Sequence, residues 1–240
     1  VDIKRDMDTS RRIYGIEVRK MFFLDGNAMV IPFQTLLDIT KYAQSLFPKL
    51  NRIGTYAHAK DIIGKTDEEL KLLHKAGLKI VYIGIESGNS ELLQQTGKSV
   101  TADQIVAAFH KCFRAGITPS GTIILGLAGN ENELAQKHMT DTADLVNRAS
   151  PKHIMPADKI PVWYISCLAL MMPEGSDIAE DTNSGKFIPQ TATGILNEMK
   201  ILIENISDDV KGCVFRSNHA SNYLPIKGRL SRDREKILGV

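Results

Sequence analysis

Side chains that could bind a polar ligand follow several short apolar runs of the sequence, at the point where each run ends. Carboxylates, hydroxyls and amides hydrogen-bond to hydroxyl or amine groups, and glycine lets the backbone approach a ligand closely. The sequence has no Gly-rich loop of the P-loop or dinucleotide type, so the ligand need not carry a polyphosphate. The polar segments are Asp25-Gly26-Asn27, Tyr56-Ala57-His58, Glu86-Ser87-Gly88-Asn89, Gly126-Leu127-Ala128-Gly129-Asn130-Glu131 and Met172-Pro173-Glu174-Gly175-Ser176.

The apolar runs before these segments are predicted to be strands, separated by amphipathic helices. Most of the runs are continuously apolar, which is typical of strands covered on both faces in a parallel sheet. Thr66 and Thr101 begin capping-box patterns that mark helix starts. Strands are expected over residues 21–24, 52–57, 80–85, 122–125, 163–170 and, more weakly, 213–216. Helices are expected over residues 3–14, 34–47, 66–76, 101–115, 130–149 and 191–206, and a loop over 172–189.

This repeated strand–helix order fits two architectures, a doubly wound open sheet or a full or partial (βα) barrel. In both, ligands bind at the carboxyl ends of the strands. The five polar segments therefore predict a shared pocket at one edge of the sheet. The alternative, that each is only a turn with a helix cap, stays open for any one of them.

Length and charge restrict the function classes. A chain of 240 residues is long enough for one sizeable core, and 30 basic against 28 acidic residues leave a net charge of +2. No extended basic block indicates a nucleic-acid surface, and no run approaches the roughly 18 apolar residues of a membrane span. No signal peptide is recognised, so a cytoplasmic protein is expected.

The cysteines and most histidines are predicted to be structural. Cys112, Cys167 and Cys213 are too far apart in sequence for a compact metal or redox motif, and each lies in an apolar segment. The histidines on predicted helices are expected to be structural too. His58, beside a strand end, is a candidate substrate contact.

The segment "RSNHASNY" near the C-terminus is dense in donors and acceptors. Such density in a segment with little apolar content often lines a pocket, and a capped turn network is the alternative interpretation. Its candidate substrate contacts are Arg216, Asn218, His219 and Asn222.

Four segments together resemble the radical S-adenosylmethionine (SAM) enzymes, in order and spacing: "MFFLDGNAM", "RIGTYA", "VYIGIESGNSELLQQTGKSVT" and "GITPSGTIILGLAGNE". The nearest branch contains oxygen-independent coproporphyrinogen oxidase and related Fe–S oxidoreductases. The resemblance covers about residues 18 to 230. It implies an α/β fold, a partial (βα)6 TIM-like barrel of parallel strands over residues 1–206, with the first βα unit incomplete or missing. Residues 207–240 would form a short C-terminal extension packed on the barrel.

The resemblance also implies a function and a set of ligand contacts. A [4Fe–4S] cluster would reduce SAM to methionine and a 5′-deoxyadenosyl radical, which abstracts hydrogen from an unknown substrate. Ferredoxin or flavodoxin would donate the electron. The SAM contacts implied are Asp25, Gly26 and Asn27 for the methionine amino group, Glu86 and Ser87 for the ribose and methionyl part, Lys98 for the carboxylate, Thr122 for the ribose, and Gly126 and Leu127 for adenine.

Two departures from the family pattern are visible. The adenine motif Gly-x-Ile-x-Gly-x-x-Glu lacks its glutamate after Gly126, and the Cys-x-x-x-Cys-x-x-Cys motif that holds the cluster does not occur. We expect the cluster loop to lie upstream of Val1. Two other functions therefore stay open: a cluster-independent (βα)-barrel enzyme acting on a small molecule, and a non-catalytic SAM-binding or scaffold domain.

Overall fold

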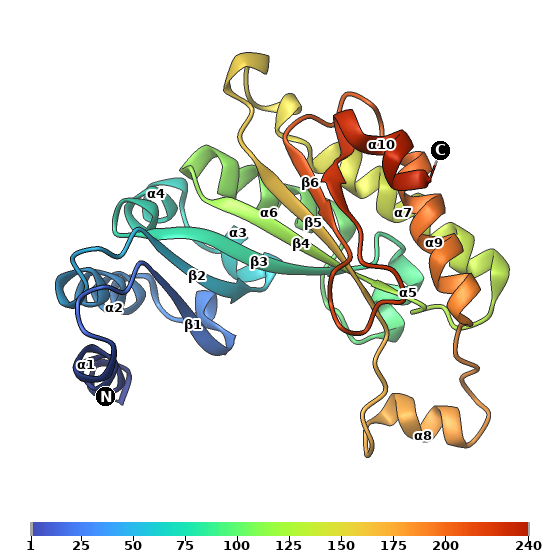
Figure 1. Ribbon diagram of the computed structural model, residues 1–240, viewed down its shortest axis with the longest axis horizontal. Coiled ribbons are helices and arrows are strands. Elements are labelled where there is room, and N and C mark those ends of the chain that lie inside the picture. Colours follow the sequence, from blue (N-terminus) through green and yellow to red (C-terminus); the bar gives the residue numbers. More distant parts are fainter. Residues whose placement is uncertain (1, 240) are drawn as a thin grey trace. The chain divides into compact units, whose positions relative to one another are not determined.

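The computed structural model describes residues 2–239, except for the side chain of Asp25. Seven strands form one sheet in sequence order, β1 to β7 (Figure 1). The pairs β1–β2, β2–β3 and β5–β6 are parallel, and β6–β7 is antiparallel. The sheet is open, with β1 and β7 at its edges. The predicted α/β class with mostly parallel strands is confirmed.

The chain forms two compact units, residues 1–84 with 107–120 and residues 85–106 with 121–240. In the first unit, the capping box of Thr66 and Glu69 starts α4, and α1 packs on α2, which also contacts α4. Its elements are α1 Asp2–Tyr14, β1 Lys20–Asn27, η1 Ala28–Val30, α2 Phe33–Leu46, β2 Arg52–Ala57, α3 Ala59–Ile63 and α4 Asp67–Lys75, with most of β3 Leu78–Glu86 and of α6 Ala102–Ala115.

In the second unit, α7 packs against α9, and α10 packs against β7, β6 and α9 (Figure 1). Large apolar side chains such as Trp163 and Phe215 are fully buried between these helices and the strands. Its elements are α5 Ser90–Gln95, most of β4 Thr118–Leu125, α7 Asn132–Ala149, η2 Pro151–His153, η3 Ala157–Lys159, β5 Trp163–Ala169, α8 Asp177–Asn183, α9 Ala192–Asn205, β6 Cys213–Arg216, β7 Lys227–Arg229 and α10 Leu230–Leu238.

One expectation about the strands is wrong. Strands covered on both faces were predicted, but β5 alternates: Trp163, Ile165 and Cys167 are buried, whereas Tyr164 and Ser166 are partly exposed. Because side chains alternate along a strand, its partly exposed residues lie on one face, which can meet a ligand. The polar residues that could do so therefore lie along the strands as well as at their ends.

Several predicted elements agree with the structure, including the strand that was expected more weakly over residues 213–216. β2 and β6 coincide with the predicted strands, and α1 begins one residue earlier than expected. The short elements α3, α5, β7 and α10 were not predicted. The loop expected over residues 172–189 is wrong in part, because Asp177–Asn183 forms α8. The boundary expected between residues 206 and 207 stays a prediction.

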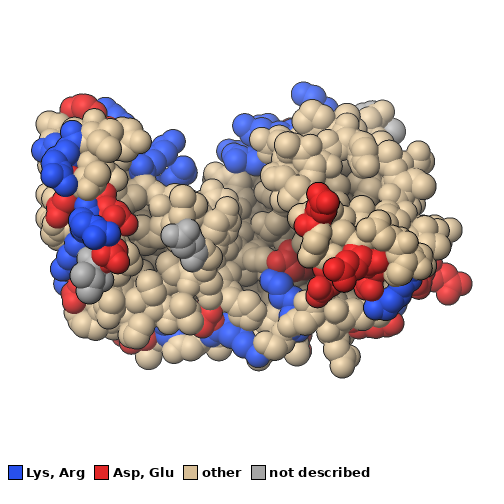
Figure 2. Space-filling view, turned by 90° about the horizontal axis from the view of Figure 1, so that it is seen from below, with Lys and Arg blue, Asp and Glu red and all other residues tan. Residues whose placement is uncertain are grey.

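The surface charge and the hydropathy of the helices agree with what the sequence predicted. Both signs of charge are spread over the face shown in Figure 2, as the near-neutral balance suggests. None of the described helices is both long enough and apolar enough to cross a membrane.

Candidate functional site

The end of β3 has an unusual backbone. Glu86 has φ of +58°, and no other described residue except glycine has a positive φ. This left-handed conformation costs an L-residue roughly 1–2 kcal/mol. The Glu86 carboxylate accepts a hydrogen bond from Lys98 Nζ at 2.8 Å, and both side chains are only partly exposed. A strained turn thus holds an acidic and a basic group together at a strand end.

The three residues after Glu86 are held by one turn of α7. Gly88 also lies so close to this helix that a Cβ there would overlap the Asp141 carbonyl oxygen. The packing of the turn on α7 therefore requires glycine. The bonds join Ser87 Oγ to His138 Nδ1 (2.7 Å), the Gly88 N–H to Thr142 Oγ1 (2.8 Å) and the Asn89 amide to Asp141 Oδ2 (2.7 Å).

His138 is a neutral, structural histidine. Its Nε2 lies 2.9 Å from the Ile124 carbonyl oxygen, which only accepts, so Nε2 carries the proton and Nδ1 accepts from the Ser87 hydroxyl. Burial lowers the pKa of His138 to about 4, which keeps the ring uncharged at neutral pH. A structural role was predicted for this histidine, and its hydrogen bonds confirm it.

Ser87 has internal partners for its hydroxyl. The side chain is fully buried, donates to His138 and accepts from the Asn89 N–H at 2.8 Å. In this structure Ser87 fixes the turn that carries Glu86. The SAM contact expected from Ser87 stays a prediction.

A buried glutamate supports the predicted adenine segment. Gly126 has φ of +79° and donates its N–H to Glu198 Oε2 at 2.6 Å. Glu198 is 1% exposed, and its burial raises the pKa of the carboxyl to about 7. Leu127 and Thr122 are both partly exposed, Thr122 on the same face of β4 as Ile124. The sequence analysis missed Glu198, although a charged residue between buried Ile195 and Met199 on one helix was a usable signal.

In the first unit, Asn27 joins the end of β1 to the start of α3. Its Oδ1 accepts from the Met29 N–H at 3.1 Å and the His58 N–H at 3.2 Å, and its amide donates to Asp61 at 2.5 Å. His58 in turn caps α3 by accepting from the Lys60 N–H. The structure thus brings the predicted residues Asn27 and His58 together, and they hydrogen-bond to each other through the His58 N–H and Asn27 Oδ1. Their ligand contacts stay predictions.

The neighbouring residues of that predicted group are less defined. Gly26 is exposed and has φ of +83°, a backbone conformation that glycine adopts readily. Asp25 lies in β1, but its side chain is outside the described part of the structure, so the contact predicted for Asp25 is not described.

The C-terminal segment forms a turn network for most of its polar residues. The Asn222 amide donates to the carbonyls of Cys167 and Ser217 and accepts from the Ala169 N–H. His219 bonds to Ser221 on the surface, and Asn218 is exposed. The capped-turn interpretation thus describes Asn222 and His219 in this structure.

Arg216 differs from its neighbours in that segment. It lies at the end of β6 with its guanidinium over the ring of Tyr164, 4.8 Å from the ring centre. Of the four substrate contacts predicted in the segment, Arg216 is the one that lines a hollow of the second unit, together with Tyr164.

The three cysteines do not fit a [4Fe–4S] cluster. All are buried, and burial raises the pKa of the Cys112 thiol to about 12. Cys213 pairs with Trp163 in the β5–β6 register, and Cys167 lies four residues beyond Trp163, about 13 Å further along β5. Within residues 2–239, no group of three His, Cys, Asp or Glu side chains could hold a metal ion. The described residues therefore provide no ligand set for the cluster.

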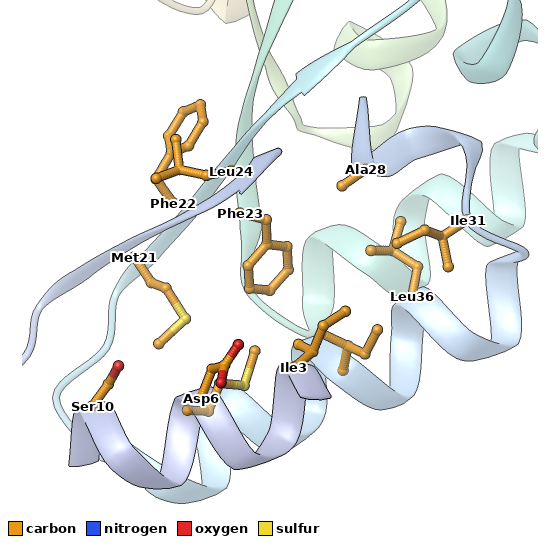
Figure 3. A pocket seen from close by; sticks show the side chains of 12 residues that line it. Ile3, Asp6, Ser10, Met21, Phe22, Phe23, Leu24, Ala28, Ile31 and Leu36 are labelled. Atoms are coloured by element: carbon orange, nitrogen blue, oxygen red, sulfur yellow. The ribbon is translucent and has the colours of Figure 1, made fainter. Parts of the chain in front are cut away.

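A hollow of about 260 Å³ in the first unit lies between α1, β1 and α2 (Figure 3). Met21 and Phe23 point from β1 toward α1, whereas Phe22 points to the other side of the strand. Most of the lining is apolar, with Asp6 and Ser10 as exceptions. None of the predicted site residues lines this hollow, so it is separate from the candidate chemistry.

The comparison with family models decides the family. The model of the Radical SAM superfamily matches residues 3–141, which is more than half of the chain. The chain belongs to the radical SAM superfamily. The matched residues of this radical SAM chain include the turn after β3 that is hydrogen-bonded to α7 (residues 86–89), the glycine segment after β4 and most of α7. The family resemblance seen in the sequence is confirmed.

Solved radical SAM enzymes share the fold of this chain at low sequence identity. Coproporphyrinogen III oxidase (HemN) from Escherichia coli, a radical SAM enzyme, aligns with a TM-score of 0.60 and 13% identity over 84% of this chain and 43% of its own. Elp3 from the archaeon Methanocaldococcus infernus gives 0.59 and 12%, over 99% of this chain and 57% of its own. Methylornithine synthase (PylB) gives 0.55 and 12%, over 97% and 66%.

These structural matches show the fold alone. They support the partial, open barrel that was predicted. The chain spans roughly half to two thirds of the length of these proteins. Among curated proteins, no sequence matches the chain.

Proposed function

We propose that this chain is the SAM-binding part of a radical SAM enzyme, in which SAM is cleaved reductively and the resulting radical abstracts hydrogen from a substrate. The observation that carries the proposal is that the family match covers the strained β3 turn, where Glu86 and Lys98 form an acid–base pair. A carboxylate beside an ammonium complements the amino and carboxylate groups of a zwitterionic amino acid such as the methionyl part of SAM.

In this proposal each residue binds or orients SAM. Glu86 accepts hydrogen bonds from the amino group or the ribose hydroxyls, and Lys98 pairs with the carboxylate. Thr122 contacts the ribose, and the Gly126-Leu127 backbone, fixed by Glu198, lies against adenine. Asp25 and Gly26 contact the methionine amino group, while Asn27 and Ser87 hold the two turns in place.

The cluster is proposed to be held by residues outside this sequence. A [4Fe–4S] cluster supplies the electron for SAM cleavage in this superfamily, and the buried cysteines of this chain do not fit it. We assign no step of the cleavage to residues of this chain. The electron donor is proposed to be a ferredoxin or flavodoxin. The substrate, a small molecule or a macromolecule, is not identified by the site.

SAM binding to the chain tests the proposal. We expect the chain alone to bind SAM in equilibrium dialysis, and Glu86→Gln and Lys98→Met to weaken binding at least tenfold. Asp181→Asn is the matched control, because Asp181 also pairs with a lysine, Lys186, but on the exposed surface of α8. Equal affinity in all variants would contradict the assigned roles.

Cleavage tests the enzyme class. The complete gene product, reconstituted anaerobically with iron, sulfide and a reductant, should release 5′-deoxyadenosine. Binding of SAM without cleavage by that protein would instead support a non-catalytic SAM-binding domain. Absence of SAM binding altogether would support a cluster-independent barrel enzyme.

A further inference from the structure

Three basic side chains lie on one face of β6 and β7. Val214 pairs with Arg229, and Arg216 with Lys227, in the antiparallel register. Residues paired across a sheet share a face, as do residues two apart in a strand. Arg216, Lys227 and Arg229 therefore project on the same side, opposite Phe215 and Gly228, which α10 covers.

A hollow of about 510 Å³, which we call the basic hollow, lies at this face and extends over the edge strand β7 to the start of α10. A volume of this size is typical of sites for small molecules. Its charged side chains are basic except for Asp233, and its apolar part comes from two valines and an aromatic ring. It is lined by Val162, Tyr164, Val214, Arg216, Lys227, Gly228, Arg229, Arg232 and Asp233.

The positive charge of the basic hollow is not balanced by the protein. Its one carboxylate, Asp233, already binds the Arg232 guanidinium at 2.8 and 3.2 Å and accepts from the Arg229 backbone N–H. In the described part of the chain, no carboxylate pairs with the side chains of Arg216, Lys227 or Arg229. Three like charges on one face repel one another, and an anion among them would relieve this repulsion.

Arg216 is held in place for such a contact. Stacking on the Tyr164 ring orients its planar guanidinium. Its Nε is buried and has no hydrogen-bond partner in the structure. A buried donor without a partner costs free energy, so the protein itself leaves this guanidinium incompletely hydrogen-bonded. The arginine fork matches the two oxygens of a carboxylate or phosphate.

We propose that the basic hollow binds the anionic group, a carboxylate or a phosphate, of a small molecule with an apolar carbon body. The two valines and Tyr164 would contact that body. The chain carries a net charge of only +2, so three clustered charges favour a small acid over a nucleic acid, which needs an extended basic surface. We infer further that this molecule is the substrate of the enzyme, and this step rests on the proposed function. The binding of the anion in the hollow does not depend on the proposed function.

Anion titration of the chain tests the proposal. Inorganic phosphate and glutarate are titrated by calorimetry at constant ionic strength, with chloride as the balancing anion. We expect at least one of them to bind, and Lys227→Gln and Arg229→Gln to weaken its binding at least fivefold. Preference for phosphate or for glutarate then identifies which anionic group the hollow takes.

Two further variants make the result specific. Arg216→Lys keeps the charge but loses the fork and the stack, so it should weaken binding by an intermediate factor. Lys137→Gln removes an exposed lysine of α7 in the same unit and should change nothing. The side chains of Lys227 and Arg229 are exposed, so their variants are expected to keep the melting temperature of the parent chain. Absence of binding by both anions, or equal binding by all variants, overturns the proposal.

SAM dialysis with the same variants separates this proposal from the function proposed above. Lys227→Gln and Arg229→Gln should bind SAM like the parent chain while losing the anion. If the parent chain binds the anion but not SAM, the basic hollow stands and the proposed function fails. If SAM binding falls together with anion binding, the hollow serves the SAM carboxylate and the inference of a separate site is wrong.

Discussion

At the scale of single residues, Glu86 combines a strained backbone conformation with a carboxylate that could bind a ligand. Its φ of +58° suits glycine, yet a glutamate occupies the position and pairs with Lys98. Strained residues persist when the surrounding structure holds them, and they cluster at sites of function. The conformation of Glu86 therefore supports the choice of this turn as the centre of the candidate site.

The strained backbone of Glu86 predicts that glycine is more stable than alanine at this position, the reverse of the usual order of stability. Both Glu86→Ala and Glu86→Gly lose the ion pair, but only glycine adopts the left-handed backbone without cost. We expect Glu86→Gly to be more stable than Glu86→Ala by about 0.5–1 kcal/mol in urea unfolding. At Glu133, in the first turn of α7, the order should be the usual one, with alanine more stable by about 1 kcal/mol. The same order at both positions would argue against a strained Glu86.

Glu198 predicts a pH dependence of stability. Burial raises its pKa to about 7 in the folded chain, above the ordinary value of 4.5 for a glutamate, so the folded state holds the proton more tightly than the unfolded state. The stability that this group contributes is present below pH 4.5 and is lost as the pH rises to about 7, with a size of about 1–3 kcal/mol.

The variant Glu198→Gln tests this pH dependence. It removes the ionisation, so its free energy of unfolding should fall less than that of the parent chain between pH 4.5 and 7. Glu204→Gln, an exposed glutamate on the same helix, is the control and should follow the parent. Parallel curves for all three proteins would contradict the assignment.

At the scale of elements, one turn of α7 determines the geometry of the β3 turn. Thr142 is central because its hydroxyl accepts from the Gly88 N–H and donates to the His138 carbonyl at 2.6 Å. The group is buried, so a lost partner is not replaced by water. The helix thus positions Glu86 without touching it through a side-chain bond.

Removal of this hydroxyl should be costly. Thr142→Val leaves the Gly88 N–H buried without an acceptor, which we expect to lower the free energy of unfolding by about 1–3 kcal/mol. Thr142→Ser keeps the hydroxyl and should recover most of the loss. Thr140→Val, whose hydroxyl bonds only to the Lys137 carbonyl on the surface, should cost little. Hydrogen exchange at the Gly88 amide measures the local effect, and unchanged protection in Thr142→Val would contradict this role.

The sequence predicted the bounds of β2, and also those of β6 from a weaker apolar pattern, because burial against a core determines both strands. It did not predict α8, a short helix without buried residues, or β7, a short strand that pairs with β6 and packs on α10. It identified Glu86 and Lys98 but not their pairing, and it missed Glu198 and Thr142. A side chain that bonds to a segment distant in sequence leaves little local pattern.

At the scale of the whole molecule, the chain has the radical SAM fold, but the residues that the structure describes provide no ligand set for the cluster. Cys112 lies in α6, Cys167 in β5 and Cys213 in β6, and all three thiols are buried. Burial raises the pKa of each thiol, to about 12 for Cys112. Only a thiolate reacts or binds iron readily. These cysteines are therefore unreactive for two reasons: they are buried, and they stay protonated.

This protection predicts the behaviour of the isolated chain. In the folded protein at pH 8, a thiol reagent such as DTNB should label fewer than one cysteine in an hour, and in guanidinium chloride all three should react at once. Anaerobic incubation with iron and sulfide, followed by desalting, should leave no [4Fe–4S] absorbance near 400 nm, because that cluster needs three thiolates in one place. A chain that retained the absorbance, and lost it in Cys112→Ser, Cys167→Ser or Cys213→Ser, would show that the cysteines rearrange to hold a cluster. That outcome would contradict the proposal that the cluster ligands lie outside this sequence, while leaving the SAM contacts of Glu86 and Lys98 to be tested separately.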